Sequence, residues 1–385
     1  MAKLGEVCIQ ITDGSHNPPF GVEQSEYLML SSKNIDDDFI TLDSPRFLSH
    51  SDYIAENKRT TVSEGDLLMT IVGTIGRVAI VPEELKGICL QRSVAVIKPE
   101  REVVNNRYLM YQLQNMRPFL EKEARGVAQK GIYLKQVSQL DIKIPELEHQ
   151  MQIVKVLDKA SNLIFLRRQQ LAKMDELVKA RFVEMFGTFP ANPFRWSIGK
   201  IQDVVSDVRY GSSRPAVEGG KYPYLRMNNI TYSGELDLHD TKRIDIPDSE
   251  LDKCTVRRGD VLFNRTNSKE LVGKTCVYNR DELMVLAGFV IRVRVNERIR
   301  PEVLSAFLNM DFSKRMLIGM CKTAIGQANI NAKELQNIDL YIPPIELQDQ
   351  FVTLKNKIDQ QKQTVQQSLE KLELMKKALM QEYFG

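Results

Sequence analysis

The sequence is poor in the residues from which most catalytic and metal sites are built. It contains only 4 histidines in 385 residues, and no two of them stand at the spacing of a metal-ligand pair. Its 5 cysteines are an odd number and form no C-x-x-C motif, which argues against a zinc ribbon or a disulfide framework and favours free thiols in a reducing cytoplasm. No Ser-His-Asp or Cys-His constellation can be assembled. We therefore expect this chain to hold no catalytic residue, no cofactor and no metal.

Long hydrophobic runs and blocks of like charge are missing as well. The longest apolar stretch, residues 283–291, is far shorter than the roughly 20 residues that a membrane-spanning helix needs, and no apolar leader opens the sequence. The net charge is only +3; residues 1–143 hold 17 basic and 19 acidic residues, and residues 189–343 hold 23 and 19. Any contact with nucleic acid must therefore come from a shaped, partly neutral surface rather than from a polybasic arm.

What the sequence does have is an internal repeat. Residues 144–187 match residues 342–385 at an offset of 198, without a gap and with 15 identities in 44 positions. Both copies begin with Ile-Pro-x-x-Glu-x-Gln-x-Gln and end with Phe-Gly. The segments before them match more weakly, at offsets of 194 to 198; Gly-Asp-Leu-Leu at 65–68, for example, corresponds to Gly-Asp-Val-Leu at 259–262. The chain is therefore organised as two variable modules, each followed by a closely repeated segment.

Each repeated segment is predicted to be one long helix. Apolar residues recur every three or four positions over residues 153–185 and again over 351–379, with neither proline nor glycine between them. This spacing is typical of a coiled-coil seam. A helix of about 35 residues is about 50 Å long, which is more than one module can cover, so we expect the helices to pair with each other rather than to pack only on their own modules. Arg167 and Lys362 are charged residues of this seam, which would weaken the pairing, fix its register or contact a further partner.

The two variable modules are predicted to be mixed α+β. Short β-rich runs separated by Gly, Asn and Asp turns lie at 66–72, 77–81 and 94–98, and then at 260–263, 274–278 and 289–295. A helical stretch follows in each module, near 103–120 and 301–318. The predicted fold class is therefore α+β, with two similar mixed α/β modules separated by two long helices.

Three short motifs resemble enzyme or metal-site signatures, and none of them is specific. Asn-Pro-Pro-Phe at 17–20 matches a tetrapeptide of DNA adenine methyltransferases, in which the aromatic ring stacks on a flipped base. Here it lacks the preceding hydrophobic strand and any glycine-rich cofactor loop, so it indicates a turn in a binding loop. Residues 72–76, Val-Gly-Thr-Ile-Gly, lack the lysine of a phosphate-binding loop and indicate a hairpin. The three acidic residues at 36–38 are interpreted as a solvated turn.

Taken in order along the chain, these segments resemble the specificity subunits of type I restriction–modification systems. The resemblance covers essentially the whole chain. It rests on the two repeated helical segments, on the Gly-Asp-(Leu/Val)-Leu runs, and on the segments at 13–19, 271–274 and 327–330. It implies two target recognition domains, residues 1–143 and 189–342, each reading one half of a bipartite DNA target. It also implies two spacer helices, within 144–188 and 343–385, that pair as an antiparallel coiled coil with pseudo-twofold symmetry.

The resemblance further implies which partners the chain has and where the chemistry lies. The expected partners are double-stranded DNA, two methylation subunits bound to the helices, and restriction subunits that join through the complex. S-adenosylmethionine, and ATP with Mg if the complex restricts, are expected on those partners, so the chain would be a non-catalytic DNA-binding subunit in the cytoplasm. Two alternatives remain open, a self-sufficient DNA adenine methyltransferase and a coiled-coil scaffold unrelated to DNA.

We expect the DNA contacts to come from polar loop residues that can bond to base edges or to phosphates. In the first module these are Ser15, His16, Asn17, Lys33, Asn34, Thr74, Arg77 and Lys130. In the second module they are Arg214, Arg226, Asn228, Asn229, Arg265, Asn267, Ser268, Lys274, Gln327 and Asn329. The two sets differ in chemistry, since the counterpart of Ser-His-Asn-Pro-Pro at 15–19 is Ser-Ser-Arg-Pro at 212–215. The modules are therefore predicted to read different sequences.

Overall fold

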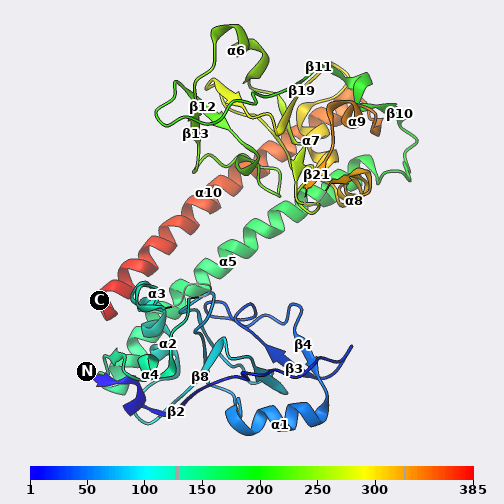
Figure 1. The fold of residues 1–385 in the computed structure, drawn as a ribbon. Helices are drawn as coiled ribbons and strands as arrows, with labels where there is room; N and C mark the ends of the chain where they lie inside the picture. The colour runs from blue at the N-terminus through cyan, green and yellow to red at the C-terminus, as the bar shows by residue number, and fades with distance from the viewer. Residues whose placement is uncertain (126–129, 325–326) are drawn as a thin grey trace. The chain divides into compact units, whose positions relative to one another are not determined.

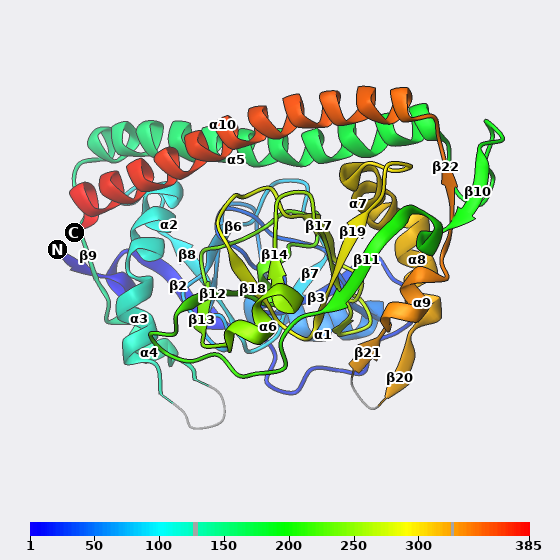
Figure 2. The same cartoon turned by 90° about the horizontal axis from the view of Figure 1, so that it is seen from above.

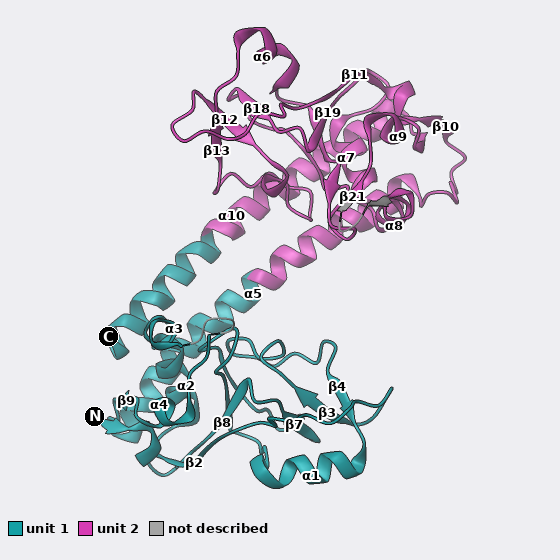
Figure 3. Cartoon of the chain, in the orientation of Figure 1, with its two compact units in different colours: residues 1–167, 368–385 teal, residues 168–367 magenta. Residues whose placement is uncertain are grey.

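The structure, a computed structural model, describes residues 1–125, 130–324 and 327–385. The chain divides into two compact units, which are residues 1–167 with 368–385 (unit 1) and residues 168–367 (unit 2) (Figure 3). Two helices of 40 residues, α5 (Leu147–Phe186) and α10 (Ile345–Phe384), each contribute one half to each unit. The prediction of one long helix in each repeated segment is confirmed.

Unit 1 is built on two small sheets (Figure 1). One has four antiparallel strands in the order β2-β8-β5-β6, which are Cys8–Asp13, Val94–Pro99, Leu67–Thr70 and Val78–Ile80. The other has the order β4-β3-β7, which are Arg46–Leu48, Tyr27–Leu30 and Ile88–Leu90, with β3 parallel to β7. Successive side chains of a strand point to opposite faces. Leu67 and Met69 therefore join the core on the helical side, whereas Leu68 joins the core on the other face.

Helices cover one face of the four-stranded sheet β2-β8-β5-β6. They are α2 (Asn106–Asn115), α3 (Arg117–Glu123) and α4 (Leu134–Ser138); α1 (His50–Thr60) packs on the other sheet, and β1 (Ala2–Lys3) pairs with β9 (Asp141–Ile142). The end of α10 lies against α2 (Figure 2). The rings of Tyr108 and Phe384 meet there, with their centroids 5.3 Å apart. Ile153 and Leu157 near the start of α5 share one core with Met380 and Phe384 near the end of α10. The two helix segments are therefore antiparallel in unit 1.

Unit 2 repeats this plan. Its first sheet has the order β11-β19-β15-β17, which are Val205–Tyr210, Val290–Val295, Val261–Asn264 and Thr275–Val277. Its second sheet has the order β13-β12-β18-β14, which are Lys242–Ile244, Tyr222–Leu225, Met284–Leu286 and Thr255–Val256, with β12 parallel to β18. Smaller ladders join β16 (Thr266–Asn267), β21 (Gln327–Asn329) and β20 (Lys322–Ala324), and join β10 (Ser197–Lys200) to β22 (Asp339–Ile342).

The helices of unit 2 are α6 (Asp248–Cys254), α7 (Pro301–Asn309), α8 (Asp311–Met320) and α9 (Ala332–Gln336). Phe182 and Phe186 at the end of α5 meet Phe351 near the start of α10 edge to face, with ring centroids 5.4 to 5.5 Å apart. The helix segments are thus antiparallel in unit 2 as well, and the predicted fold class is confirmed.

The repeat extends to single hydrogen bonds. Gln150 and Gln348, the first glutamines of the two Ile-Pro-x-x-Glu-x-Gln-x-Gln segments, are both 0 % exposed. In unit 1 the side-chain amide bonds at 2.8 to 3.1 Å to the backbone of Val103, Asn105 and Pro145. In unit 2 it bonds at 2.8 to 3.0 Å to the backbone of Arg298, Arg300 and Pro343. A buried amide costs free energy unless it is satisfied, so these glutamines fasten the start of each long helix to its own module.

Two sequence-based expectations need correction. The helical stretches predicted near 103–120 and 301–318 are each broken, at Met116 and at Met310. Pro118 explains the first break, because proline is tolerated only in the first turn of a helix. The apolar spacing predicted over 351–379 includes Met375, but Met375 is 45 % exposed. The neighbouring Lys376 turns inward instead and pairs with Asp38 at 3.2 Å. Across residues 1–125, 130–324 and 327–385, no helix combines the length and the apolar character needed to cross a bilayer.

Candidate nucleic-acid interface

In unit 1, several loops meet where β2, β3, β5 and β7 end and β8 begins. Backbone hydrogen bonds of 2.7 to 2.9 Å connect them, from Ser15 N to Leu90 O, from Arg92 N to Ser15 O, from Ile71 N to Ser93 O and from Ile132 N to Ile71 O. The Ser93 hydroxyl also accepts from Ser32 N at 3.0 Å. Loops that are far apart in the sequence, at 14–17, 31–34, 71–77, 91–93 and 130–132, therefore form one surface.

The same backbone frame recurs in unit 2. Ser212 N donates to Leu286 O, Gly288 N to Ser212 O, Arg265 N to Phe289 O and Ile330 N to Arg265 O, at 2.7 to 3.0 Å. In these backbone hydrogen bonds Ser212 corresponds to Ser15, Gly288 corresponds to Arg92, and Arg265 corresponds to Ile71. Both units therefore present loops of the same construction.

Glycine is required where the first of these loops leaves the sheet. A Cβ atom on Gly14 would lie 2.1 Å from the carbonyl oxygen of Leu90, and one on Gly211 would lie 2.1 Å from the carbonyl oxygen of Leu286. No side chain fits at such a distance. This close approach fixes the direction in which each loop leaves its strand.

Most of the residues predicted for unit 1 lie on this surface. The side chains of His16, Asn17, Lys33, Thr74 and Lys130 are exposed, and that of Arg77 is half-buried with Asp36 at 3.7 Å. His16 Nε2 lies 2.8 Å from a carboxylate oxygen of the buried Asp13, whose other oxygen accepts from Arg59 at 2.6 Å. The imidazole is therefore held in place while half of it stays accessible.

Ser15 and Asn34, in contrast, are buried, at 8 % and 3 % exposed. The Asn34 carboxamide accepts from Ser31 N at 3.0 Å and donates to the carbonyl oxygens of Thr41 and Asp43. It closes the loop that presents Lys33, and little of it is left for a ligand.

The residues predicted for unit 2 divide in the same way. Asn229 is 2 % exposed and repeats the role of Asn34, accepting from Arg226 N at 2.8 Å and donating to Asp237 O at 2.8 Å. Lys274 is 7 % exposed; burial lowers the pKa of its ammonium group, which donates to Met227 O at 2.9 Å. These two side chains hold loops in place.

The remaining predicted residues of unit 2 lie at the surface or close to it. Arg214 is exposed and paired with Glu250 at 2.7 Å, Arg226 is paired with Asp240 at 2.8 Å, and Asn228 is exposed. Asn267, Ser268 and Asn329 are half-buried, and Asn329 Oδ1 accepts from the Thr266 hydroxyl at 3.0 Å. Gln327 belongs to β21, and its side chain lies outside what the structure describes.

Arg265 differs from the other arginines of this surface. Its guanidinium lies over the ring of Tyr210, 4.8 Å from the centroid, and no acidic side chain in the described part of the chain pairs with it. Its Nε is buried and has no hydrogen-bond partner among the described residues. Stacking on an aromatic ring holds the guanidinium plane in one orientation, so its donors are preset for a ligand.

Sequence reasoning missed three residues of these surfaces. Arg92 is exposed between the loops of unit 1, and Phe289, 55 % exposed, occupies the corresponding stretch of unit 2. Tyr210 supports Arg265 from β11. Aligning Gln-Arg-Ser-Val at 91–94 with Ala-Gly-Phe-Val at 287–290 would have identified both loops, because Val94 and Val290 begin equivalent strands.

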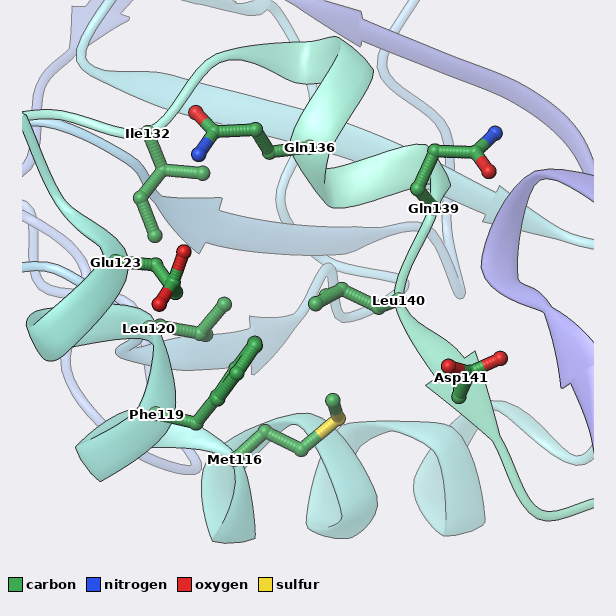
Figure 4. Close-up of a pocket in the computed structure, with 9 residues that line it drawn as sticks. All are labelled: Met116, Phe119, Leu120, Glu123, Ile132, Gln136, Gln139, Leu140 and Asp141. Atoms are coloured by element: carbon green, nitrogen blue, oxygen red, sulfur yellow. The ribbon is translucent and has the colours of Figure 1, made fainter.

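No group of three or more His, Cys, Asp or Glu side chains suited to a metal ion occurs among the described residues. Unit 1 has a hollow of about 420 Å³ on its helical side (Figure 4). Its apolar lining comes from Met116, Phe119, Leu120, Ile132 and Leu140, and its polar lining from Glu123, Gln136, Gln139 and Asp141. Its lining includes none of the predicted site residues. The hollow is therefore separate from the loop surface.

Comparison with known proteins identifies the class. The family model for the type I restriction modification DNA specificity domain matches residues 29–175 and 195–374. The chain therefore belongs to this family and holds two copies of the domain.

Individual relatives agree with the family match. The chain is 25% identical over 349 residues to the type I restriction enzyme MjaVIII specificity subunit of Methanocaldococcus jannaschii, covering 84% of this chain and 79% of that protein. It is 24% identical over 229 residues to the EcoKI specificity subunit of Escherichia coli K12, covering 55% and 49%, and 26% identical over 196 residues to the putative MjaX specificity subunit of M. jannaschii, covering 50% and 46%. The chain thus spans about half the length of the latter two.

Two solved structures share the fold. One is the S subunit of a type I restriction–modification system from M. genitalium, with a TM-score of 0.55 and 12% identity, covering 100% of this chain and 95% of that one. The other comes from work on the assembly of a type I restriction–modification system, with a TM-score of 0.52 and 20% identity, covering 100% and 96%. The resemblance inferred from the sequence is confirmed.

Proposed function

We propose that this chain is the DNA sequence-specificity subunit of a type I restriction–modification complex. Each unit reads one half of a bipartite double-stranded target, and α5 and α10 space the two readers and hold two methylation subunits. Restriction subunits join through the complex. We assign the recognition domains to residues 1–143 and 189–342 and the spacer helices to 144–188 and 343–385.

One observation supports this proposal most strongly: the two units present different side chains on the same backbone frame. Arg265 of unit 2 stands where unit 1 has the buried Ile71, and Gly288 stands where unit 1 has the exposed Arg92. Each base pair presents its own pattern of donors and acceptors in the major groove. A fixed frame with exchanged side chains is therefore suited to reading two different half-sites.

The chemistry of the exposed groups fits duplex DNA. A guanidinium held by stacking can donate two parallel hydrogen bonds to a guanine edge, and lysines such as Lys33 and Lys130 can contact phosphates without reading sequence. Predicted residues with buried side chains, such as Asn34, Asn229 and Lys274, support the loops.

Methyl transfer and cleavage belong, in this proposal, to the partner subunits. S-adenosylmethionine would be bound by the methylation subunits, and ATP with Mg by the restriction subunits where they are present. This chain supplies no catalytic residue and acts in the cytoplasm, where its DNA target is found.

The test is methylome mapping with the chain assembled with its methylation subunits. Replacing Arg265 and Asn267 together by alanine should relax one half-site and leave the other unchanged, because the two residues lie in unit 2 alone. A good bidentate contact gives roughly 1–3 kcal/mol of discrimination. Arg258→Ala is the matched control, since this exposed arginine, paired with Asp281, lies before β15 at its opposite end.

Equal loss at both half-sites would contradict independent reading by the two units. Stoichiometric binding of S-adenosylmethionine to the isolated chain would instead favour a self-sufficient methyltransferase. If duplex DNA showed no salt-dependent shift with the assembled complex, the scaffold alternative would gain.

A further inference from the structure

Phe20 is the most exposed large apolar side chain in the described part of the chain, at 98 %. It stands at the tip of the loop that leaves β2 and contains Ser15, His16 and Asn17. Its neighbours contribute nothing to covering the ring, so the apolar surface of the ring is left entirely to water. A ligand that covers an aromatic ring in that position removes apolar surface from water, which stabilises the complex.

The loop that presents Phe20 is anchored on both sides of the tip. Before it, Ser15 N donates to Leu90 O at 2.7 Å; after it, Val22 N donates to Phe47 O at 3.0 Å on β4. Arg46 also donates to Pro19 O at 2.7 Å, directly beside the tip. Consecutive prolines at 18 and 19 restrict the backbone further. Phe20 is therefore held out by a fastened loop, and little conformational freedom remains to be lost on binding.

Unit 2 has no counterpart of this side chain. Six residues separate Ser15 from Val22, whereas four, Ser-Arg-Pro-Ala, separate Ser212 from Val217, which makes the equivalent bond to the strand β13. The aromatic tip is therefore a property of unit 1 alone, and its effect should appear at one half-site only.

We propose that Phe20 is a specificity-determining residue that inserts its ring between stacked base pairs at the half-site read by unit 1. The proposal rests on the DNA-reading function given above. Apolar wedges of this kind partly unstack a base step, and the cost depends on the step, being lowest at flexible pyrimidine–purine steps. Phe20 would thus select sequence by deformability, next to the hydrogen-bonding groups of His16 and Asn17.

The surroundings of Phe20 favour DNA over a protein partner. Surfaces that dock proteins present contiguous apolar patches with an apolar core. Along its loop, which the structure describes throughout, Phe20 instead has only Val22, which is 42 % exposed, as another exposed apolar side chain. The arm before it carries the polar His16 and Asn17, and Arg46 bonds Pro19 O directly beside it. The stretch that follows at residues 23–26, Glu-Gln-Ser-Glu, is charged and not apolar.

The experiment uses the full chain assembled with its methylation subunits and duplexes in which 2-aminopurine replaces one base at a time. Binding of the unaltered complex should raise the fluorescence at one step of the first half-site, where stacking is lost. Phe20→Ala should abolish that rise and weaken binding roughly tenfold, within the range for losing one aromatic–base stack. Phe20→Trp should preserve both, and its added indole fluorescence should be quenched by DNA. Ile9→Ala is the control, because Ile9 is 70 % exposed at the opposite end of β2.

Each outcome decides one question. If Phe20→Ala keeps the fluorescence rise, the affinity and the methylation pattern, Phe20 does not read DNA. If it impairs assembly with the methylation subunits while DNA signals per assembled complex stay unchanged, Phe20 is a protein contact and the proposal is overturned. If the unaltered complex itself shows no sequence preference, the proposed function fails first, independently of Phe20.

Discussion

Lys314 is a buried ammonium group for which the described residues supply no carboxylate. It is 7 % exposed, donates to Gly273 O at 2.6 Å and lies 5.6 Å from the centre of the Tyr232 ring. Burial, together with repulsion from Lys179 and Lys274, lowers its pKa to about 7. The hydrogen bond to Gly273 O stabilises the loop there, whereas burial of the charged ammonium group lowers the free energy of unfolding. This second contribution depends on pH because the charge of Lys314 does.

We expect Lys314→Met to stabilise unit 2, by an amount that decreases as the pH rises from 7 to 9.5. The folded pKa lies below the unfolded value of about 10.4, so in this window the unfolded state binds more protons. The unaltered protein therefore gains stability with rising pH, by at most about 1.4 kcal/mol per unit, whereas the variant does not. Urea unfolding of both proteins at pH 6, 8 and 9.5, followed by Trp196 fluorescence, measures the difference. Trp196 is the single tryptophan and lies in unit 2. A difference independent of pH would contradict the account.

At the residue scale, the candidate site could be predicted only in part. Loop positions with polar side chains were recognisable, and Lys33 and Asn228 do lie exposed on the loops. Asn34 and Asn229 could not be told apart from them, because an asparagine that closes a loop and one that reads a base have the same sequence context. Arg92 was missed because the drift of the repeat offset between 194 and 198 hid its place in the frame.

At the scale of elements, Lys362 shows what a charge in the helix seam does. It lies on α10, its ammonium 2.5 Å from Asp175 of α5, and it also bonds the carboxylate of Glu235 in the loop before β13 of unit 2. Burial alone would lower the pKa of the Lys362 ammonium group. The bonds to the two carboxylates raise that pKa by a larger amount, so it lies above its ordinary value. Of the roles open from the sequence, the bond to Asp175 favours fixing the register of the helix pair, and the bond to Glu235 also fastens a loop of unit 2 to the two helices.

Lys362→Met should destabilise unit 2 by about 1–2 kcal/mol, between the values typical of exposed and of buried ion pairs. The loss arises because the variant leaves two carboxylates close together without their cation. Adding Asp175→Asn and Glu235→Gln should recover part of it, since the repulsion is then removed. Urea unfolding at pH 7 followed by Trp196 fluorescence checks both variants. Equal stability of Lys362→Met and the unaltered protein would show that the contacts of Lys362 with Asp175 and Glu235 contribute no more than exposed ion pairs do.

The long helices were the most predictable elements, because an unbroken three-and-four spacing has few alternatives. Central strands such as β5 and β15 were also located, since their residues are apolar and buried on both faces. The edge strand β2 was not, because Ile9 and Gln10 are both exposed and a register shift between Cys8 and Gln10 interrupts its pairing with β8, so the alternation in its sequence does not mark one buried face. The way the loops meet depends on long-range backbone bonds, which no local pattern encodes.

At the scale of the whole molecule, α5 and α10 are the elements that both units share. We expect their common length to set the number of unread base pairs between the half-sites. Inserting four residues into both helices, after Arg167 and after Gln367, lengthens each by about 6 Å, close to two base pairs at about 3.4 Å each. The unread gap should grow by one or two base pairs while both half-site sequences stay the same, because no recognition loop is touched. Methylome mapping reads both quantities.

The phase of the helix supplies the control for this prediction. Four residues turn the helix by about 400°, which keeps the apolar stripe nearly in line, whereas two residues turn it by about 200° at 3.6 residues per turn. A two-residue insertion should therefore break the pairing and abolish methylation, although it adds less length. A seven-residue insertion, one heptad, restores the phase and should widen the gap by about three base pairs. An active four-residue variant with an unchanged gap would mean that elements other than these helices set the separation.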